Sequence, residues 1–449
     1  MAIFFPVISI VYELIFTLFS IVSNFHNMST LTHPKTFQNF FIEWTTFDPT
    51  TLKATFQYSF DHEEYFTEVI DFSCEGFEVR KDLDWEIIKN LLFHTSIALG
   101  ISYYKLCPSA QIIVTTGKLE TPQKAFWKKF YLQWLGEYLF RNNILPEWIG
   151  VFESMSDEIF RKIPFSLWEK LLVPIGGGKD SIVSTGMLDE QWDDYDLFTF
   201  GKYYILHDAV ARVSGHRHLV VKRTLDPYLF ELNALGYPNG HVPITGIIAF
   251  VLQIVNYLYG YRMDVLSNEK SADEGNVLWH GIDVNHQYSK SREFEEDFRA
   301  YSEAYMSDTE YKSILRDLYE IEIAERFAKM RAYFPVFSSC NNNFKVIESN
   351  KTTSDRWCLQ CPKCVFVFAI LRPYITHEDV ITIFGRDLYE DISLIPLYEE
   401  LLGQSGHKPF ECVGTHDEVI LSLQRAVEKY REERRGIPEV LWVLKKWYS

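Results

Sequence analysis

The chain has 449 residues, of which 47% are hydrophobic and 16% aromatic, a composition that supports well-packed cores and excludes a largely disordered protein. Its 61 acidic and 44 basic side chains give a net charge of −17, which argues against binding of long nucleic acids but not of a small anion. Seven cysteines, three of them in one short run, do not fit a secreted disulfide framework, so we expect a reducing, cytoplasmic setting.

The first 25 residues are almost wholly apolar, with Glu13 as the only charge. A segment of this length could span a bilayer, but it lacks the basic start and the cleavage site of a secretory signal. Three interpretations stay open for residues 1–28. They are sequence upstream of a true start at Met28, a membrane contact or anchor through residues 1–25, or a helix packed on the body.

Residues 29–122 are expected to form a small β-rich domain, because short runs of β-type composition alternate with turns around one helical pattern at 85–100. Strands are predicted at 52–58, 65–70 and 111–115. Residues 123–165 have a helical, aromatic-rich pattern, which predicts a connector to the next domain.

From residue 166 to residue 449 the pattern indicates a second, catalytic domain. Strands are predicted at 171–175, 202–206, 218–221 and 263–266, and helices at 181–189, 208–213, 227–235 and 244–259. Strands that alternate with helices predict an α/β fold with a doubly wound parallel sheet, in which ligands bind beyond the carboxyl ends of the strands. The last of these helices is apolar but contains Gln253 and Asn256, so we expect it to be buried in the protein.

Residues 174–181 (PIGGGKDS) carry the strongest local signal. Three glycines after a strand let the backbone come close to an anion, and the N–H groups of the following helix point at it. Asp180 adds a carboxylate beside that anion, which is reasonable if Mg²⁺ lies between the two. The segment is not a kinase-type P-loop, because Asp180 stands where Ser or Thr would follow Gly-Lys.

This loop resembles the Ser-Gly-Gly-x-Asp-Ser signature of the PP-loop ATP pyrophosphatases, with Gly176 in place of the first Ser. The resemblance implies a sheet of that type, ATP as the cofactor, and cleavage of ATP to AMP and diphosphate. It also implies a set of nucleotide-binding residues, namely Gly176, Gly177, Gly178, Lys179, Asp180 and Ser181.

Five further segments are similar to one branch of this superfamily, the UDP-N-acetylmuramoyl-L-alanyl-L-glutamate epimerase family. They are residues 239–245 (NGHVPIT), 267–276 (SNEKSADEGN), 284–291 (VNHQYSKS), 356–364 (RWCLQCPKC) and 406–411 (GHKPFE). The resemblance implies an ATP- and Mg²⁺-dependent isomerase of peptidoglycan synthesis. Such an enzyme turns the terminal L-Glu of its UDP-N-acetylmuramoyl dipeptide substrate into D-Glu.

That chemistry needs a titratable group, because a base must take the α-proton once adenylation has removed the negative charge of the carboxylate. His286 and His241 titrate nearest neutral pH, and Glu274 is the next candidate. The candidate substrate-binding residues are Lys270, Asn276, Asn285 and Lys290. A single loop histidine is often structural and a lysine is often a surface charge, so the density of polar residues supports the prediction more than any one of them.

Cys358, Cys361 and Cys364 are spaced as in a metal-binding knuckle, and Cys340 precedes them by eighteen residues. Four thiolates suit tetrahedral Zn²⁺, so a structural zinc site is expected, with an iron–sulfur cluster less favoured and reduced, metal-free cysteines as the alternative.

Two other functions stay open at this stage. One is a PP-loop enzyme that adenylates a nucleobase or a tRNA, and the net charge of −17 weighs against the tRNA. The other is a non-catalytic nucleotide-binding protein, which Gly176 slightly favours and which Asp180 and Ser181 argue against.

Overall fold

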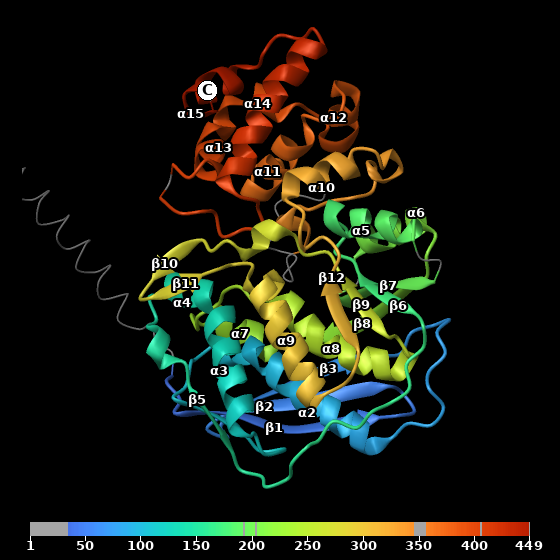
Figure 1. The fold of residues 1–449 in the computed structure, drawn as a ribbon. Coiled ribbons are helices and arrows are strands. Elements are labelled where there is room, and N and C mark those ends of the chain that lie inside the picture. The colour runs from blue at the N-terminus through green and yellow to red at the C-terminus, as the bar shows by residue number, and fades with distance from the viewer. Residues whose placement is uncertain (1–34, 192–193, 203, 345–355, 405, 449) are drawn as a thin grey trace, which may run out of the picture.

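The computed structural model describes residues 35–191, 194–202, 204–344, 356–404 and 406–448 (Figure 1). Within these residues a ten-stranded sheet forms the centre of the molecule, in the order β12-β9-β6-β7-β8-β3-β2-β1-β4-β5. Its strands are β1 (Asn39–Asp48), β2 (Lys53–Phe60), β3 (Glu64–Asp71), β4 (Gln111–Val114), β5 (Val151–Ser154), β6 (Leu171–Pro174), β7 (Tyr195–Gly201), β8 (His218–Thr224), β9 (Met263–Leu266) and β12 (Glu310–Ser313). The three interpretations of residues 1–28, the membrane contact among them, fall outside the described residues.

The second part of the chain forms the parallel half of this sheet, which confirms the predicted α/β class. Strands β12, β9, β6, β7 and β8 all pair in parallel. Strand β8 then pairs antiparallel with β3, where Thr224 lies opposite Val69. The N-terminal strands therefore extend the same sheet, with β3, β2 and β1 antiparallel and β4 and β5 parallel to β1.

One strand prediction is wrong in position. Strand β7 covers Tyr195–Gly201 instead of 202–206, and helix α6 (Ile205–Ser214) begins inside the range predicted as strand. The β7 residues are buried up to Phe200, and the buried Asp196 pairs with Arg217 Nε at 3.0 Å and with Lys170 Nζ at 2.9 Å. A carboxylate inside a strand makes its sequence look like a loop, and its partners lie elsewhere in the chain.

Helices α2 (Trp85–Tyr104) and α8 (Ile244–Tyr259) pack against each other on the sheet, and α8 confirms the predicted buried helix. The polar residues that interrupt α8 have buried partners: Asn256 Nδ2 donates to Asp264 at 2.9 Å, and Gln253 Oε1 accepts from Thr309 at 2.7 Å. Among the described residues, no helix is both long enough and apolar enough to cross a membrane.

The region predicted as a helical connector, residues 123–165, is helical only in its first half. Helices α3 (Thr121–Trp134) and α4 (Gly136–Asn142) are followed by β5, which pairs with β4 at the edge of the sheet. The aromatic-rich pattern reflects packing of both segments on one core, since Trp127 and Phe152 are each buried.

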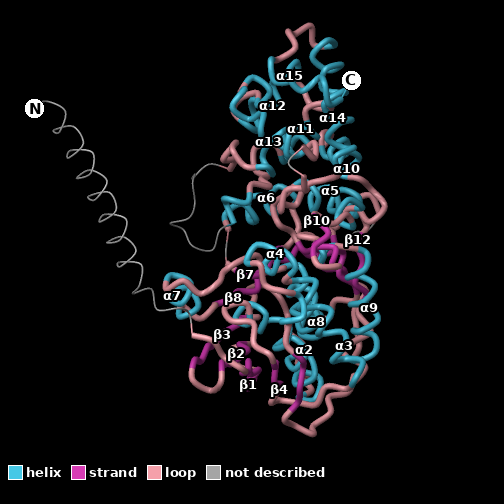
Figure 2. The backbone as a smooth tube through the Cα atoms, turned by 90° about the vertical axis from the view of Figure 1, so that its left-hand side faces the viewer, coloured by secondary structure: helices cyan, strands magenta, loops and turns pink. Residues whose placement is uncertain are grey.

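The C-terminal part is a group of helices that lies above the carboxyl ends of the parallel strands in Figure 1. Figure 2, turned by 90°, shows the same group above the sheet. It consists of α10 (Glu320–Phe327), α11 (Pro362–Leu371), α12 (His377–Phe384), α13 (Ile395–Leu401), α14 (His416–Glu432) and α15 (Glu439–Tyr448). Helix α10 packs against α5 (Lys179–Asp189), the helix that follows the glycine loop. The two parts of the chain thus meet at the loop that the sequence singles out.

Candidate active site

The glycine loop joins β6 to α5, as the sequence predicts. Gly177 has a φ of +76°, in the left-handed region that favours glycine, and a Cβ there would lie 3.3 Å from the His207 ring. A Cβ on Gly178 would lie 2.8 Å from Ser339 Oγ. No side chain among the described residues caps α5, so its first N–H groups are suited to an anion.

Three carboxylates converge beside this loop. Asp180, Glu269 and Glu320 each offer an oxygen within 4.8 Å of the others. The ammonium of Lys179 is fully buried and pairs with both Asp180 and Glu320. Burial opposes ionisation of Asp180, but the neighbouring Lys179 outweighs this effect and lowers the pKa of Asp180. For Glu320 the balance is reversed, because burial and the negative charge of Asp180 outweigh Lys179 and raise the pKa of Glu320.

These carboxylates fit a magnesium ion. One buried oxygen of Glu269 and one of Glu320 accept no hydrogen bond from the described residues, and hard oxygen ligands of this kind are what Mg²⁺ prefers. Asp180 would complete a set of three oxygen ligands at the N-terminus of α5, next to where an anion would lie.

A second polar group lies around the two predicted histidines. His286 Nδ1 is 2.5 Å from Glu137 Oε2, and the rings of His286 and His241 are 4.2 Å apart. Burial opposes protonation of His286, but its contacts with Cys412 and Glu137 raise its pKa to about 9. Burial and the neighbouring His286 lower the pKa of His241 to about 3. Near neutral pH the pair therefore holds one imidazolium and one neutral imidazole.

One cavity of about 1490 Å³ is lined by both the glycine loop and one of the two histidines. Its lining includes Gly176 and His241, together with Lys105 and Arg223. Ligand pockets are typically about 300–1,000 Å³, so this cavity has room for more than one ligand.

The remaining predicted residues lie at different depths. Lys290 interacts with Asp180 and Cys412 in the interior, whereas Lys270 is exposed and lies over the Tyr319 ring at 4.5 Å. Glu274 is also exposed, with its carboxylate 4.0 Å from Lys408 Nζ.

The two predicted asparagines form hydrogen bonds to the backbone of the loops around His286. Asn276 Oδ1 accepts from the His286 backbone N–H at 2.7 Å, and its Nδ2 donates to the Pro409 carbonyl at 2.7 Å. Asn285 Nδ2 donates to the Ala272 carbonyl at 2.8 Å. Both amides therefore fix the backbone that carries His286.

Several residues of the site carry no signal that the sequence reasoning used. Glu137 lies in α4, and its hydrogen bond to His286 joins residues 149 positions apart. Glu320 lies 141 positions from Lys179, the predicted loop residue with which it forms an ion pair. Cys412 could have been found, because it directly follows the GHKPFE segment and stands outside the knuckle.

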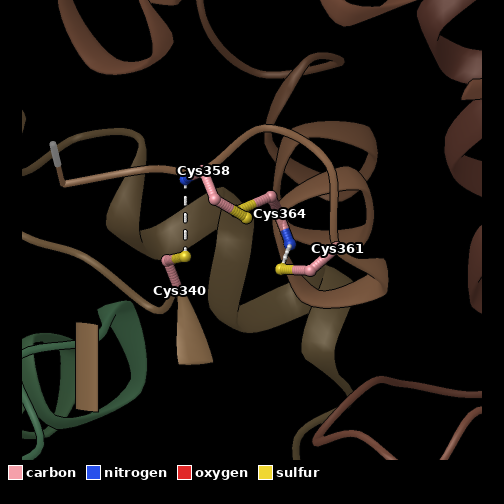
Figure 3. Close-up of side chains that lie close together, drawn as sticks. All are labelled: Cys340, Cys358, Cys361 and Cys364. Atoms are coloured by element: carbon pink, nitrogen blue, oxygen red, sulfur yellow. Dashed lines mark hydrogen bonds between the residues drawn. The ribbon is translucent and has the colours of Figure 1, made fainter. Parts of the chain in front are cut away.

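The four cysteines of the knuckle converge as predicted (Figure 3). Their sulfur atoms lie within 4.8 Å of one another, and Cys358 Sγ is 3.7 Å from Cys364 Sγ. Zn–S bonds of about 2.3 Å in a tetrahedron place the sulfur atoms roughly 3.8 Å apart, so the cluster fits Zn²⁺. The Cys358 N–H also points at Cys340 Sγ at 3.4 Å.

The knuckle is tied to the glycine loop through Ser338. The Ser338 backbone N–H donates to the Gly177 carbonyl at 2.9 Å, and the Cys340 N–H donates to Ser338 Oγ at 3.1 Å. A displacement of the cysteine cluster would therefore be transmitted through these two hydrogen bonds to Gly177 of the glycine loop.

Comparisons with known proteins match most of the chain. The family model described as MurL N-terminal domain covers residues 31–314, and the model described as MurL C-terminal domain covers residues 336–445. A Salinispora tropica protein named UDP-N-acetyl-alpha-D-muramoyl-L-alanyl-L-glutamate epimerase is 37% identical over 384 residues, which are 84% of this chain and 82% of that protein. Proteins with the same name from Micromonospora sp. and Xanthomonas oryzae pv. oryzae are 36% and 34% identical, over 88% and 82% of this chain and 90% and 81% of their own lengths.

A solved structure titled as a predicted subunit of a tRNA methyltransferase from Methanocaldococcus jannaschii is 16% identical. It covers 36% of this chain and 76% of its own, with a TM-score of 0.24, a likeness too weak to bear on function.

Proposed function

Because this chain belongs to the MurL family of UDP-N-acetyl-alpha-D-muramoyl-L-alanyl-L-glutamate epimerases, we propose that it inverts the terminal L-Glu of UDP-N-acetylmuramoyl-L-Ala-L-Glu to D-Glu at the expense of ATP. The main support for an ATP-dependent mechanism is that Gly176 of the glycine loop and His241 line the same cavity. A substrate bound in this cavity could therefore contact both the nucleotide and an acid–base group. Such a reaction belongs in the cytoplasm, where ATP and nucleotide-linked precursors are made.

The glycine loop prepares the substrate for loss of its α-proton. Its backbone N–H groups and the start of α5 would bind the phosphates of ATP, and the half-buried Lys290 adds a positive charge that interacts with Asp180. Asp180, Glu269 and Glu320 would hold Mg²⁺, which when bound offsets the negative charge of the phosphates. Transfer of AMP to the glutamyl carboxylate removes the charge that would otherwise oppose a neighbouring carbanion.

The two histidines would handle the α-proton. His241 is neutral near pH 7 and lines the cavity, so it is suited to act as the base. His286 is protonated and 2.5 Å from Glu137, so it supplies a positive charge and a proton behind His241. The two histidines thus stay the preferred acid–base group, ahead of Glu274, which is exposed.

Lys105 is a further candidate for substrate binding. Its Nζ donates to Asn239 Oδ1 at 2.7 Å and to the Gly240 carbonyl at 2.9 Å, which leaves a third proton. Lys105 lines the cavity, and burial lowers its pKa to about 8, so an anionic group of the substrate would restore its full charge. Lys270 is exposed, so it is a weaker candidate for substrate binding than Lys105.

The direct test is incubation of the chain with ATP, Mg²⁺ and UDP-N-acetylmuramoyl-L-Ala-L-Glu, followed by chiral analysis of the glutamate. Formation of D-Glu together with AMP supports the proposal. AMP formation with a nucleobase in place of the dipeptide would indicate another adenylating enzyme, and no AMP with any substrate would indicate a nucleotide-binding protein.

Solvent hydrogen provides the second prediction. If the α-proton passes to a base such as His241, reaction in deuterated water should place deuterium at the α-carbon of most D-Glu product molecules. Mass spectrometry of the isolated dipeptide measures this. Product without deuterium would contradict exchange through a solvent-accessible base.

The third prediction concerns zinc. We expect close to one zinc per chain in protein purified without chelators, and we expect Cys361→Ser to reduce the zinc content, lower the melting temperature and weaken ATP binding through Ser338 and Gly177. Cys74→Ser is the matched control, since the Cys74 thiol is also half-buried but bonds to the Val220 carbonyl. Elemental analysis below about 0.2 zinc per chain in the parent protein would contradict a structural zinc.

A further inference from the structure

Cys412 lies outside the cysteine knuckle and directly follows the GHKPFE segment. Its backbone carbonyl accepts a hydrogen bond from Lys363, and the next carbonyl, that of Val413, accepts from Gln287 Nε2 at 3.3 Å. Its half-buried thiol interacts with His286 and with Lys290. Lys290 also interacts with Asp180, so it connects the thiol electrostatically with the carboxylates beside the glycine loop.

The partners of this thiol are arranged as in a nucleophilic triad. His286 contacts Cys412, and its Nδ1 is oriented by Glu137 Oε2 at 2.5 Å. A nucleophile, a base and a third group that orients the base are the recurrent pattern of covalent catalysis. Burial opposes ionisation of Cys412, but Lys290 and His286 lower its pKa to about 6. Burial instead raises the pKa of the half-buried Cys74 and Cys107.

The geometry points to Cys412 as a nucleophile that takes the glutamyl acyl group from AMP, an inference that rests on the proposed epimerase function. The thiolate sulfur forms a bond to the acyl carbon, the bond from that carbon to the AMP oxygen breaks, and AMP leaves with the electron pair. The product is a thioester between Cys412 and the dipeptide, and no oxidant or reductant is consumed.

A thioester is a suitable species for the inversion. Sulfur donates little electron density to the carbonyl, so the α-proton stays acidic after AMP has left. The base then removes this proton, and a proton returns to the other face. Water finally attacks the carbonyl, the C–S bond breaks, and the carboxylate, the Cys412 thiolate and the two protons of the water are released. The thiol thereby divides activation and inversion into steps served by different side chains.

The test uses the full chain with ATP, Mg²⁺ and UDP-N-acetylmuramoyl-L-Ala-L-Glu. Reactions quenched in acid within the first turnover are measured by intact mass and by peptide mapping. We expect wild-type protein to carry the dipeptide precursor, less one water, on the peptide that contains Cys412. Cys412→Ala and Cys412→Ser should lose this adduct and form D-Glu at least a hundredfold more slowly, while both keep substrate-dependent exchange of diphosphate into ATP.

The controls separate the possible failures. Cys74→Ala removes a half-buried thiol away from the site and should keep both the adduct and the rate. D-Glu formation by Cys412→Ala at the wild-type rate would overturn the role of the thiol and leave the proposed function intact. Loss of D-Glu in the variants without any adduct in the wild-type protein would overturn the thioester. Absence of D-Glu from the wild-type reaction would instead contradict the proposed function.

Discussion

Asp180→Asn is expected to abolish formation of AMP and diphosphate, with a loss of at least a hundredfold, and D-Glu formation should fall with it. The substitution keeps the shape of the side chain but removes the charge that would hold Mg²⁺ at the start of α5. Lys179 keeps its ion pair with Glu320, so the fold should survive. Chromatographic measurement of AMP, with the melting temperature as a check of folding, tests this expectation.

The control for Asp180→Asn is Glu190→Gln, which removes one negative charge at the exposed other end of the same helix. It should leave the rate unchanged. If Asp180→Asn retains more than a tenth of the wild-type rate, the loss is at most about 1.4 kcal/mol, which is too small for a metal ligand of the transferring phosphates.

His241→Asn should uncouple the two halves of the reaction. We expect ATP cleavage to AMP to continue, because the glycine loop is untouched, while D-Glu formation falls at least a hundredfold for lack of the base. The adenylated or thiol-bound substrate would then be hydrolysed with its L configuration retained. The ratio of AMP to D-Glu, which should rise sharply, measures the effect without depending on the amount of folded enzyme.

His280→Asn is the matched control for this variant. His280 is exposed in the turn between β10 (Val277–Trp279) and β11 (Ile282–Val284), with a φ of +45° that asparagine adopts readily. Its ratio of AMP to D-Glu should equal that of the wild type. An unchanged ratio in His241→Asn would contradict His241 as the base, and His286→Asn would be the next variant to measure.

The parts of the site that can be predicted from sequence are those in which one short segment contains all the residues that bind the ligand. The glycine loop follows a strand and precedes a helix, so residues 174–181 suffice to place an anion site there. The knuckle likewise depends on the spacing of Cys358, Cys361 and Cys364. His241 and His286 are 45 residues apart in the sequence, and only the fold shows that their rings lie next to each other.

The parts that cannot be predicted depend on contacts between distant segments. Glu137 looks like one more acidic residue on a helix until the fold brings it to His286. Glu320 is buried against Lys179, although its sequence neighbours Glu322 and Glu325 suggest an exposed helix. The position of β7 cannot be predicted for the same reason. The charge of Asp196 is stable in a buried strand only because Arg217 and Lys170 lie beside it.

The pairing of β3 with β8 has a consequence for how the chain folds during synthesis. A hydrogen bond of 2.7 Å from the Thr67 N–H to Asp226 joins residues 159 positions apart at this junction. At roughly 5–20 residues per second, the ribosome needs on the order of ten to thirty seconds to supply β8 after β3. During that time β3 is an open strand edge, a template for pairing with another nascent chain.

The charge of Glu68 disfavours incorrect pairing at that edge. Its carboxylate is fully buried in the folded protein and pairs with Arg223 of β8, whose Nε lies 2.6 Å away. A strand that paired with β3 without bringing a basic residue to this place would leave the Glu68 charge without a counterion in the interior, at a cost of several kcal/mol. The ion pair that joins the two halves of the sheet therefore also favours the correct pairing of β3 with β8 over pairing with a strand that lacks a basic residue.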